Sequence, residues 1–162
     1  MATSLALDSL PGARPGAELS AVVIADDAVT GRRLVAALRG DAIRVVTAAQ
    51  PEEAPAVCDR HAPDAVVFAA DLSRASQMTA LRGLRRAVGA CGIVVVVPAS
   101  QRVGTREALN NGADGFLLDT DVEPALAIIV RAVAAGHVSV PRQRRRSLVT
   151  PAFSHRERQV LA

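Results

Sequence analysis

The stretch Ala21-Val22-Val23-Ile24-Ala25-Asp26-Asp27 decides the fold: it is a continuous apolar run that ends on two acids. Three later apolar runs close at Ala69, Val97 and Asp119. Short gapless runs of β-branched residues are typical of strands buried on both faces of a parallel sheet. Because parallel strands bring their carboxyl ends to one edge, we expect these residues to meet there.

Apolar runs alternate with longer amphipathic stretches from residue 21 onward. This alternation indicates βαβ units, so we predict an α/β fold with a doubly wound, five-stranded parallel sheet. The expected strands cover 21–25, 43–48, 65–69, 92–97 and 115–118. The expected helices cover 28–39, 52–61, 74–88, 102–111 and 122–135.

The charge is concentrated at one end of the chain. All 19 basic side chains are arginine, and the formal net charge is +3. Residues 21–137 hold 13 acids and 12 arginines, whereas residues 138–162 hold six arginines and one glutamate. A basic tail can attract nucleic acid, and it can equally be a solvated linker, so the composition leaves both interpretations open.

Neither the cysteines nor the apolar runs indicate an exported or membrane protein. Cys58 and Cys91 lack a C-x-x-C spacing, which argues against a zinc site or disulfide framework and favours a reduced, cytoplasmic protein. No apolar run reaches about 18 residues, and residues 1–20 lack a signal-peptide pattern and are expected to form a disordered leader. Because no G-x-G-x-x-G, P-loop or nucleophile elbow occurs, we expect no cofactor and no enzyme activity.

Two stretches carry a family resemblance. Ala108-Leu109-Asn110-Asn111-Gly112-Ala113-Asp114-Gly115-Phe116-Leu117-Leu118 resembles the A-x-x-x-G-A-x-G-[FY]-[LI]-x stretch of the receiver domain in two-component response regulators. Phe153-Ser154-His155-Arg156-Glu157-Arg158-Gln159-Val160-Leu161 resembles the L-[ST]-x-R-E-x-[EQ]-V-L opening of the LuxR-type helix-turn-helix. Together, and in this order, they resemble the NarL/FixJ class of response regulators.

This resemblance implies a division of the chain after the leader. It implies a flavodoxin-like, CheY-like receiver over 21–137, a basic linker over 138–152, and the truncated start of an all-α helix-turn-helix domain over 153–162. Ser154 followed three residues later by Glu157 has the spacing of a capping box, which supports a helix start in the last segment.

The resemblance also assigns roles to the strand ends. In such receivers an acidic pair after the first strand holds magnesium, and an aspartate closing the third strand accepts the phosphoryl group. A hydroxyl side chain closing the fourth strand and a lysine after the fifth then bind that phosphoryl group. Asp26 and Asp27 match the acidic pair. The acceptor position falls on Ala69, the hydroxyl position on Val97 and the lysine position on Asp119.

The substituted positions lack the chemistry of phosphoryl transfer, although Phe116 keeps the aromatic switch position. Ala69 has no nucleophile, Val97 cannot donate a hydrogen bond, and Asp119 would repel a phosphate. We therefore expect a degenerate phosphorylation pocket. Asp71 is the alternative, as a displaced acceptor without its cation and hydroxyl partners.

Three acids are expected at the carboxyl edge of the sheet, which we call the rim: Asp26, Asp27 and Asp119. They allow two interpretations. They can be hydrogen-bonded carboxylates at loop edges. Alternatively, three acids without a lysine repel one another and raise a pKa, unless Arg74, Arg102 or a divalent cation relieves the repulsion. The acidic pair alone is a weak candidate for metal binding, because the third carboxylate is missing.

The last expected helix, 122–135, is nearly apolar all round. Its residues Leu126, Ile129, Val130 and Val133 supply more apolar surface than one sheet is expected to cover, which predicts a homodimer on this helix, with the first helix contributing. The alternative is that alanines make the outer face only mildly apolar.

The leading hypothesis is a phosphorylation-independent transcription regulator. Its receiver would serve for dimerisation and signal sensing, with a small-molecule effector or a partner regulator as input, and DNA binding would need the rest of the helix-turn-helix domain. The alternative is a stand-alone pseudo-receiver that binds other proteins and no DNA. A second amphipathic helix past Ala162 would favour the first hypothesis.

Overall fold

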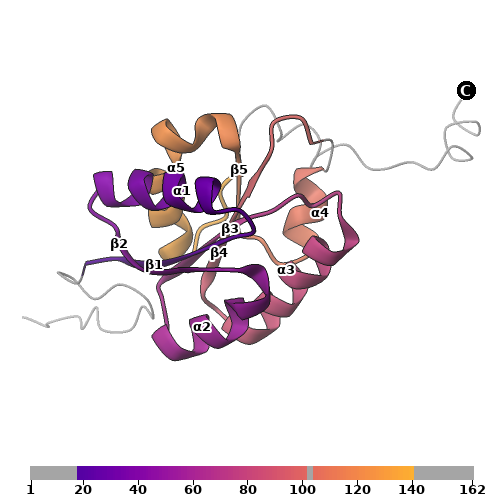
Figure 1. Cartoon of the computed structure of the whole chain (residues 1–162), viewed down its shortest axis with the longest axis horizontal. Helices are drawn as coiled ribbons and strands as arrows, with labels where there is room; N and C mark the ends of the chain where they lie inside the picture. Colours follow the sequence, from indigo (N-terminus) through magenta and orange to yellow (C-terminus); the bar gives the residue numbers. More distant parts are fainter. Residues whose placement is uncertain (1–17, 102–103, 141–162) are drawn as a thin grey trace, which may run out of the picture.

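Five parallel strands in the order β2-β1-β3-β4-β5 form the sheet of the computed structural model, which describes residues 18–101 and 104–140 (Figure 1). The strands are β1 (Ser20–Ala25), β2 (Arg44–Ala49), β3 (Ala65–Ala69), β4 (Gly92–Val97) and β5 (Gly115–Leu118). The helices are α1 (Ala28–Gly40), α2 (Ala54–His61), α3 (Ala75–Val88), α4 (Thr105–Asn110) and α5 (Val122–Ala134). The predicted doubly wound, flavodoxin-like α/β fold is confirmed.

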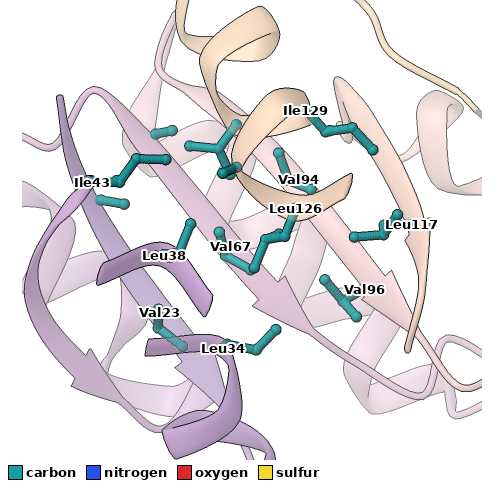
Figure 2. Close-up of a cluster of buried hydrophobic side chains, with 14 of the residues drawn as sticks. Val23, Leu34, Leu38, Ile43, Val67, Val94, Val96, Leu117, Leu126 and Ile129 are labelled. Carbon is teal, nitrogen blue, oxygen red and sulfur yellow. The ribbon is translucent and has the colours of Figure 1, made fainter. Parts of the chain in front are cut away.

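Helices cover both faces of the sheet, α1 and α5 on one face and α2, α3 and α4 on the other (Figure 1). Side chains alternate along each strand, so that Val23 packs toward α1 and α5 whereas Val22 packs toward α2 and α3. Figure 2 shows the first of these clusters, with Leu34, Leu38 and Leu126 lying over the strands. Each fully buried aliphatic side chain contributes about 1.5–3 kcal/mol, which explains why a chain with few aromatics can fold.

The element boundaries differ from the prediction mainly at two helix starts. Residues 51–53 form a 3-10 turn, and α2 begins only at Ala54. The helix expected over 102–111 begins at Thr105, after Gly104 in an extended conformation, and residues 102–103 lie outside the described part. Glycine is a poor helix former, which accounts for the later start.

The domain edges extend further than predicted. Ser20 already belongs to β1, and its backbone N–H donates to Asp64 Oδ2 at 2.8 Å, so the expected leader over 1–20 is too long. At the other end Ser139 pairs with Gly115 of β5, and the Phe116 N–H donates to the Ser139 carbonyl at 3.0 Å. The expected linker over 138–152 therefore begins as part of the sheet. Residues 1–17, 141–152 and 153–162 lie outside the described residues.

The last helix is less exposed than the sequence pattern suggested. Its predicted interface residues belong to the core of their own chain, with exposed fractions of 0% for Leu126, 8% for Ile129, 0% for Val130 and 3% for Val133. The expectation that these four side chains form an outer face is wrong.

Two glycines of the sheet explain this burial of α5. A Cβ on Gly115 would lie 2.9 Å from Ile129 Cγ2, and one on Gly92 would lie 2.3 Å from Val133 Cγ1. Real Cβ atoms do not approach this closely, so the missing side chains let the helix settle against the strands. The large apolar side chain that remains exposed on α5 is Ile128, at 69%. Within the described residues, no helix is both long and apolar enough to cross a membrane.

Candidate functional site

A small cavity of about 160 Å³ opens at the carboxyl ends of the strands. Four of the residues predicted for the degenerate pocket line it, namely Asp26, Asp27, Ala69 and Asp119. Its other lining residues come from α1, from β4, from the segments after β3 and β4, and from the start of α5: Thr30, Arg33, Leu34, Ala70, Asp71, Arg74, Val96, Pro98 and Val122. We call this the rim cavity.

The two remaining predicted residues do not line the rim cavity. Val97 and Phe116 are 1% and 0% exposed and pack together in the cluster beneath α3 and α4. Alternation along β4 explains the split, because Val96 and Val97 project to opposite faces of the sheet. The aromatic side chain at the switch position is therefore part of the core.

Asp27 is the N-cap of α1. Its Oδ1 accepts hydrogen bonds from the backbone N–H groups of Val29 and Thr30, each at 2.9 Å. Hydrogen bonds from the side chain and the backbone N–H of Thr30 hold the pKa of Asp27 below its usual value. The alternative that mutual repulsion raises a pKa is wrong for this residue, whose carboxylate is tied to the helix start.

Asp119 and Arg33 connect the end of β5 to its neighbours. Asp119 Oδ1 accepts the Ala99 N–H at 3.0 Å, and the Arg33 guanidinium donates to the Asp119 carbonyl oxygen at 2.8 Å. Arg33 also forms two hydrogen bonds of 2.6 Å with the carboxylate of Glu123. Its guanidinium lowers the pKa of Glu123 to about 2, and Glu123, followed by Asp119, raises the pKa of Arg33.

Among these contacts, the basic side chain that binds Asp119 is Arg33 of α1. The sequence had favoured an arginine from the loops, Arg74 or Arg102. Arg74 forms an ion pair with Asp71 instead, at 3.4 Å from Nε to Oδ2, and Arg102 lies outside the described residues. Arg33 was missed because its contact with Glu123 depends on α1 packing beside α5. No spacing in the sequence reports that contact.

Asp71 is held by several donors. Its Oδ1 accepts hydrogen bonds from the Ser73 N–H at 3.1 Å, from the Ser73 hydroxyl and from Gln101 Nε2. These bonds, the Ser73 hydroxyl first, lower the pKa of Asp71, and the charge of Arg74 acts in the same direction. Gln101 was also missed, since nothing in its sequence context distinguishes it from a solvated loop residue.

The arrangement does not fit the magnesium ion that the family resemblance implies. Ala69 offers no oxygen where a third carboxylate would lie, and Asp27 Oδ1 already accepts two backbone N–H groups. Magnesium needs several oxygen ligands in a near-octahedral arrangement. Among the residues that the structure describes, no group of three or more His, Cys, Asp or Glu side chains could hold a metal ion.

No protein-family model matches this chain, and no curated protein matches it. Several solved structures are similar in fold. The RcsB response regulator of Salmonella typhimurium has a TM-score of 0.68 and 15% identity, and the match covers 89% of this chain and 76% of that one. A LuxR-family response regulator from Aurantimonas sp. SI85-9A1 has a TM-score of 0.66 and 22% identity, with 80% and 94% covered.

The receiver domain of the response regulator NarL from Mycobacterium tuberculosis is also similar, with a TM-score of 0.58, 21% identity, and 70% and 97% of the two chains covered. At these identities the likeness shows the fold alone. The described part of this chain therefore has the receiver-domain fold found in LuxR- and NarL-type response regulators.

Proposed function

We propose that this chain is the receiver part of a response regulator that works without phosphorylation. Its output is transcription regulation, through a DNA-binding domain of which residues 153–162 resemble the start. The receiver itself is non-enzymatic and acts in self-association and signal sensing. The fold, the basic residues 138–162 and the two sequence motifs support this reading.

One observation carries the proposal: the carboxyl end of β3 has no nucleophile. Ala69 is paired with Ala25 of β1 and with Val96 of β4, so it occupies the centre of the rim. An alanine methyl group cannot form an acyl phosphate. The side chain that the resemblance expects to read a phosphate, at Val97, is buried and apolar.

Asp71 is the alternative acceptor that the sequence suggested, and its contacts argue against that role. Oδ1 accepts three hydrogen bonds, and Oδ2 faces the guanidinium of Arg74. A carboxylate held by charge-assisted hydrogen bonds is stabilised as an anion, and attack on a phosphodonor would require it to leave these partners. The lysine that would draw a phosphate to the rim is replaced by Asp119.

Self-association is the second part of the proposal, and we infer that it involves the exposed apolar side chain of α5, Ile128. Ile128 lies outward on α5, whereas the four residues first expected at the interface are buried. A two-fold axis through this helix would bring two Ile128 side chains together and hold two DNA-binding segments on the same side.

Sedimentation of the whole chain tests this function. We expect a dimer whose dissociation constant is the same with and without beryllofluoride, a phosphoryl analogue, because no acceptor is present. Ile128→Glu should give a folded monomer. Val138→Glu is the matched control, since Val138 is 66% exposed but lies beyond α5, and this variant should remain dimeric.

Two results would contradict the proposal. A dimer that tightens in beryllofluoride would mean that the rim still receives a phosphoryl group. A dimer that persists in Ile128→Glu would place the interface elsewhere.

A further inference from the structure

We propose that Asp71 and Asp119 form a clamp on the segment Pro98–Gln101, and that this clamp fixes the segment without a phosphoryl group at the rim. The inference rests on the proposed function and deepens it. It concerns the contacts that fix the segment directly after β4 when no group is transferred to the rim.

The clamp acts from both sides of β4. The strand order places β4 between β3 and β5, so the loops after β3 and β5 flank the segment that follows β4. From the β5 side, Asp119 Oδ1 accepts the Ala99 N–H at 3.0 Å. From the β3 side, Asp71 Oδ1 accepts Gln101 Nε2, a contact between residues 30 positions apart. Both acceptors are carboxylates, so both bonds are charge-assisted.

Gln101 is built into this arrangement. Its side chain is 9% exposed, and its backbone N–H donates to the Pro98 carbonyl at 2.9 Å, which closes a turn directly after β4. Its Oε1 is buried without a hydrogen-bond partner among the described residues. The bond to Asp71 is therefore the one that compensates the burial of this amide, and losing it would leave both amide atoms unpaired.

Asp71 is in turn fixed toward Gln101. The Ser73 N–H and hydroxyl bind the same oxygen, and Arg74 holds the other one. An acceptor with so little freedom costs little further entropy when the amide docks on it. The positions of Asp71 and Asp119 thus fix the segment Pro98–Gln101 that directly follows β4.

Hydrogen exchange followed by mass spectrometry on the whole chain tests the clamp. In Gln101→Leu we expect amides in Pro98–Gln101 and in the first turn of α4 to exchange roughly tenfold faster, including the Ala99 amide whose own bond to Asp119 is untouched. In Asp119→Ala we likewise expect the Gln101 amide to exchange roughly tenfold faster. The double variant should exchange little faster than either single one, because the two sides act together.

Asp26→Ala is the matched control, since it removes a carboxylate from the same rim cavity and leaves both clamp bonds in place. Glu123→Gln is a second control on the same rim, and both should stay within about twofold of the parent chain. If neither clamp variant speeds exchange across β4, or if exchange rises equally over the whole chain, the proposal is wrong. A phosphate adduct after acetyl phosphate treatment would instead overturn the proposed function, so the two failures are distinguishable.

Discussion

The two ends of the sheet carry aspartates, and both ends use them to hold backbone. At the amino end, Asp64 Oδ2 accepts the Ser20 N–H and hydroxyl, each at 2.8 Å, and Asp114 Oδ2 accepts the Ile93 N–H at 2.9 Å. At the carboxyl end, three of the four acids that line the rim cavity accept backbone N–H groups, from the first turn of α1 or from the loops after β3 and β4: Asp27, Asp71 and Asp119. The carboxylates at the carboxyl end are thus engaged in hydrogen bonds with backbone, as those at the amino end are.

The ends differ in how extensively their polar groups are connected and in how well they are filled. At the amino end Arg85 bonds to Asp114 and to three backbone carbonyls, those of Gly89, Gly112 and Cys91. The rim retains its cavity, and Asp26 has no side-chain partner in the part of the chain that the structure describes. The difference teaches that one arginine network holds the amino end, whereas the rim acids bind separate segments, so we expect the rim to tolerate substitution better.

The largest expected effect separates two glycines. In Gly92→Ala the new Cβ would lie 2.9 Å from the Val133 carbonyl oxygen, so α5 must move and we expect a loss of about 2–4 kcal/mol in the free energy of unfolding. Near the rim, Gly31→Ala meets only Ala25 Cβ at 3.7 Å and should be stabilising by about 0.5–1 kcal/mol. Urea unfolding measures the free energy of unfolding of both variants. Equal effects would show that the two ends of the sheet do not differ in packing.

The next effect concerns Arg85. Its side chain is 25% exposed, and Arg85→Ala would leave Asp114 without its cation and several carbonyl groups without a donor. We expect a loss of about 2–3 kcal/mol by urea unfolding. Arg82→Ala, on the same helix with a single exposed partner, is the control and should cost less than about 1 kcal/mol. A small effect of Arg85→Ala would mean that the amino end is no more stabilised than the rim.

At the rim itself, two adjacent aspartates should behave differently. Asp27→Ala removes the N-cap of α1 and should cost about 1 kcal/mol. Asp26→Ala removes a carboxylate without a described partner and should stay within about 0.5 kcal/mol. If Asp26→Ala costs as much as Asp27→Ala, the rim acids are not divided as their hydrogen bonds indicate.

The smallest effect is a pH dependence from the Arg33–Glu123 pair. Because Arg33 lowers the pKa of Glu123 from 4.5 to about 2, the stabilisation is fully present above pH 4.5 and is lost as the pH falls to about 2. The stability difference between the parent chain and Glu123→Gln should therefore shrink over that interval. The pair is exposed, so the difference should also decrease in high salt. A difference independent of pH would argue against the ion pair.

Much of the fold was predictable because local patterns report it. The apolar runs and the glycines and prolines between them gave strand ends within about a residue or two, and hence the residues that gather at the rim. The burial of Ile129 and Val133 was not predictable from the helix alone, since it depends on the missing side chains of Gly92 and Gly115.

The contacts of the rim escaped prediction for a related reason. Arg33 meets Glu123, and Gln101 meets Asp71, only after helices and loops from distant parts of the sequence have packed. The chemistry that is missing at Ala69 could be read directly, because it depends on the residue itself. The hydrogen bonds of the neighbouring rim residues could not, because they join residues that are close only in the folded chain.

Intact-mass analysis after incubation with acetyl phosphate tests the central claim most directly. We expect an unmodified chain, because Ala69 offers no carboxylate and Asp119 opposes the incoming charge. A stoichiometric phosphate adduct that disappears in Asp71→Asn would contradict it, and would show that the receiver has moved its acceptor by two residues instead of losing it.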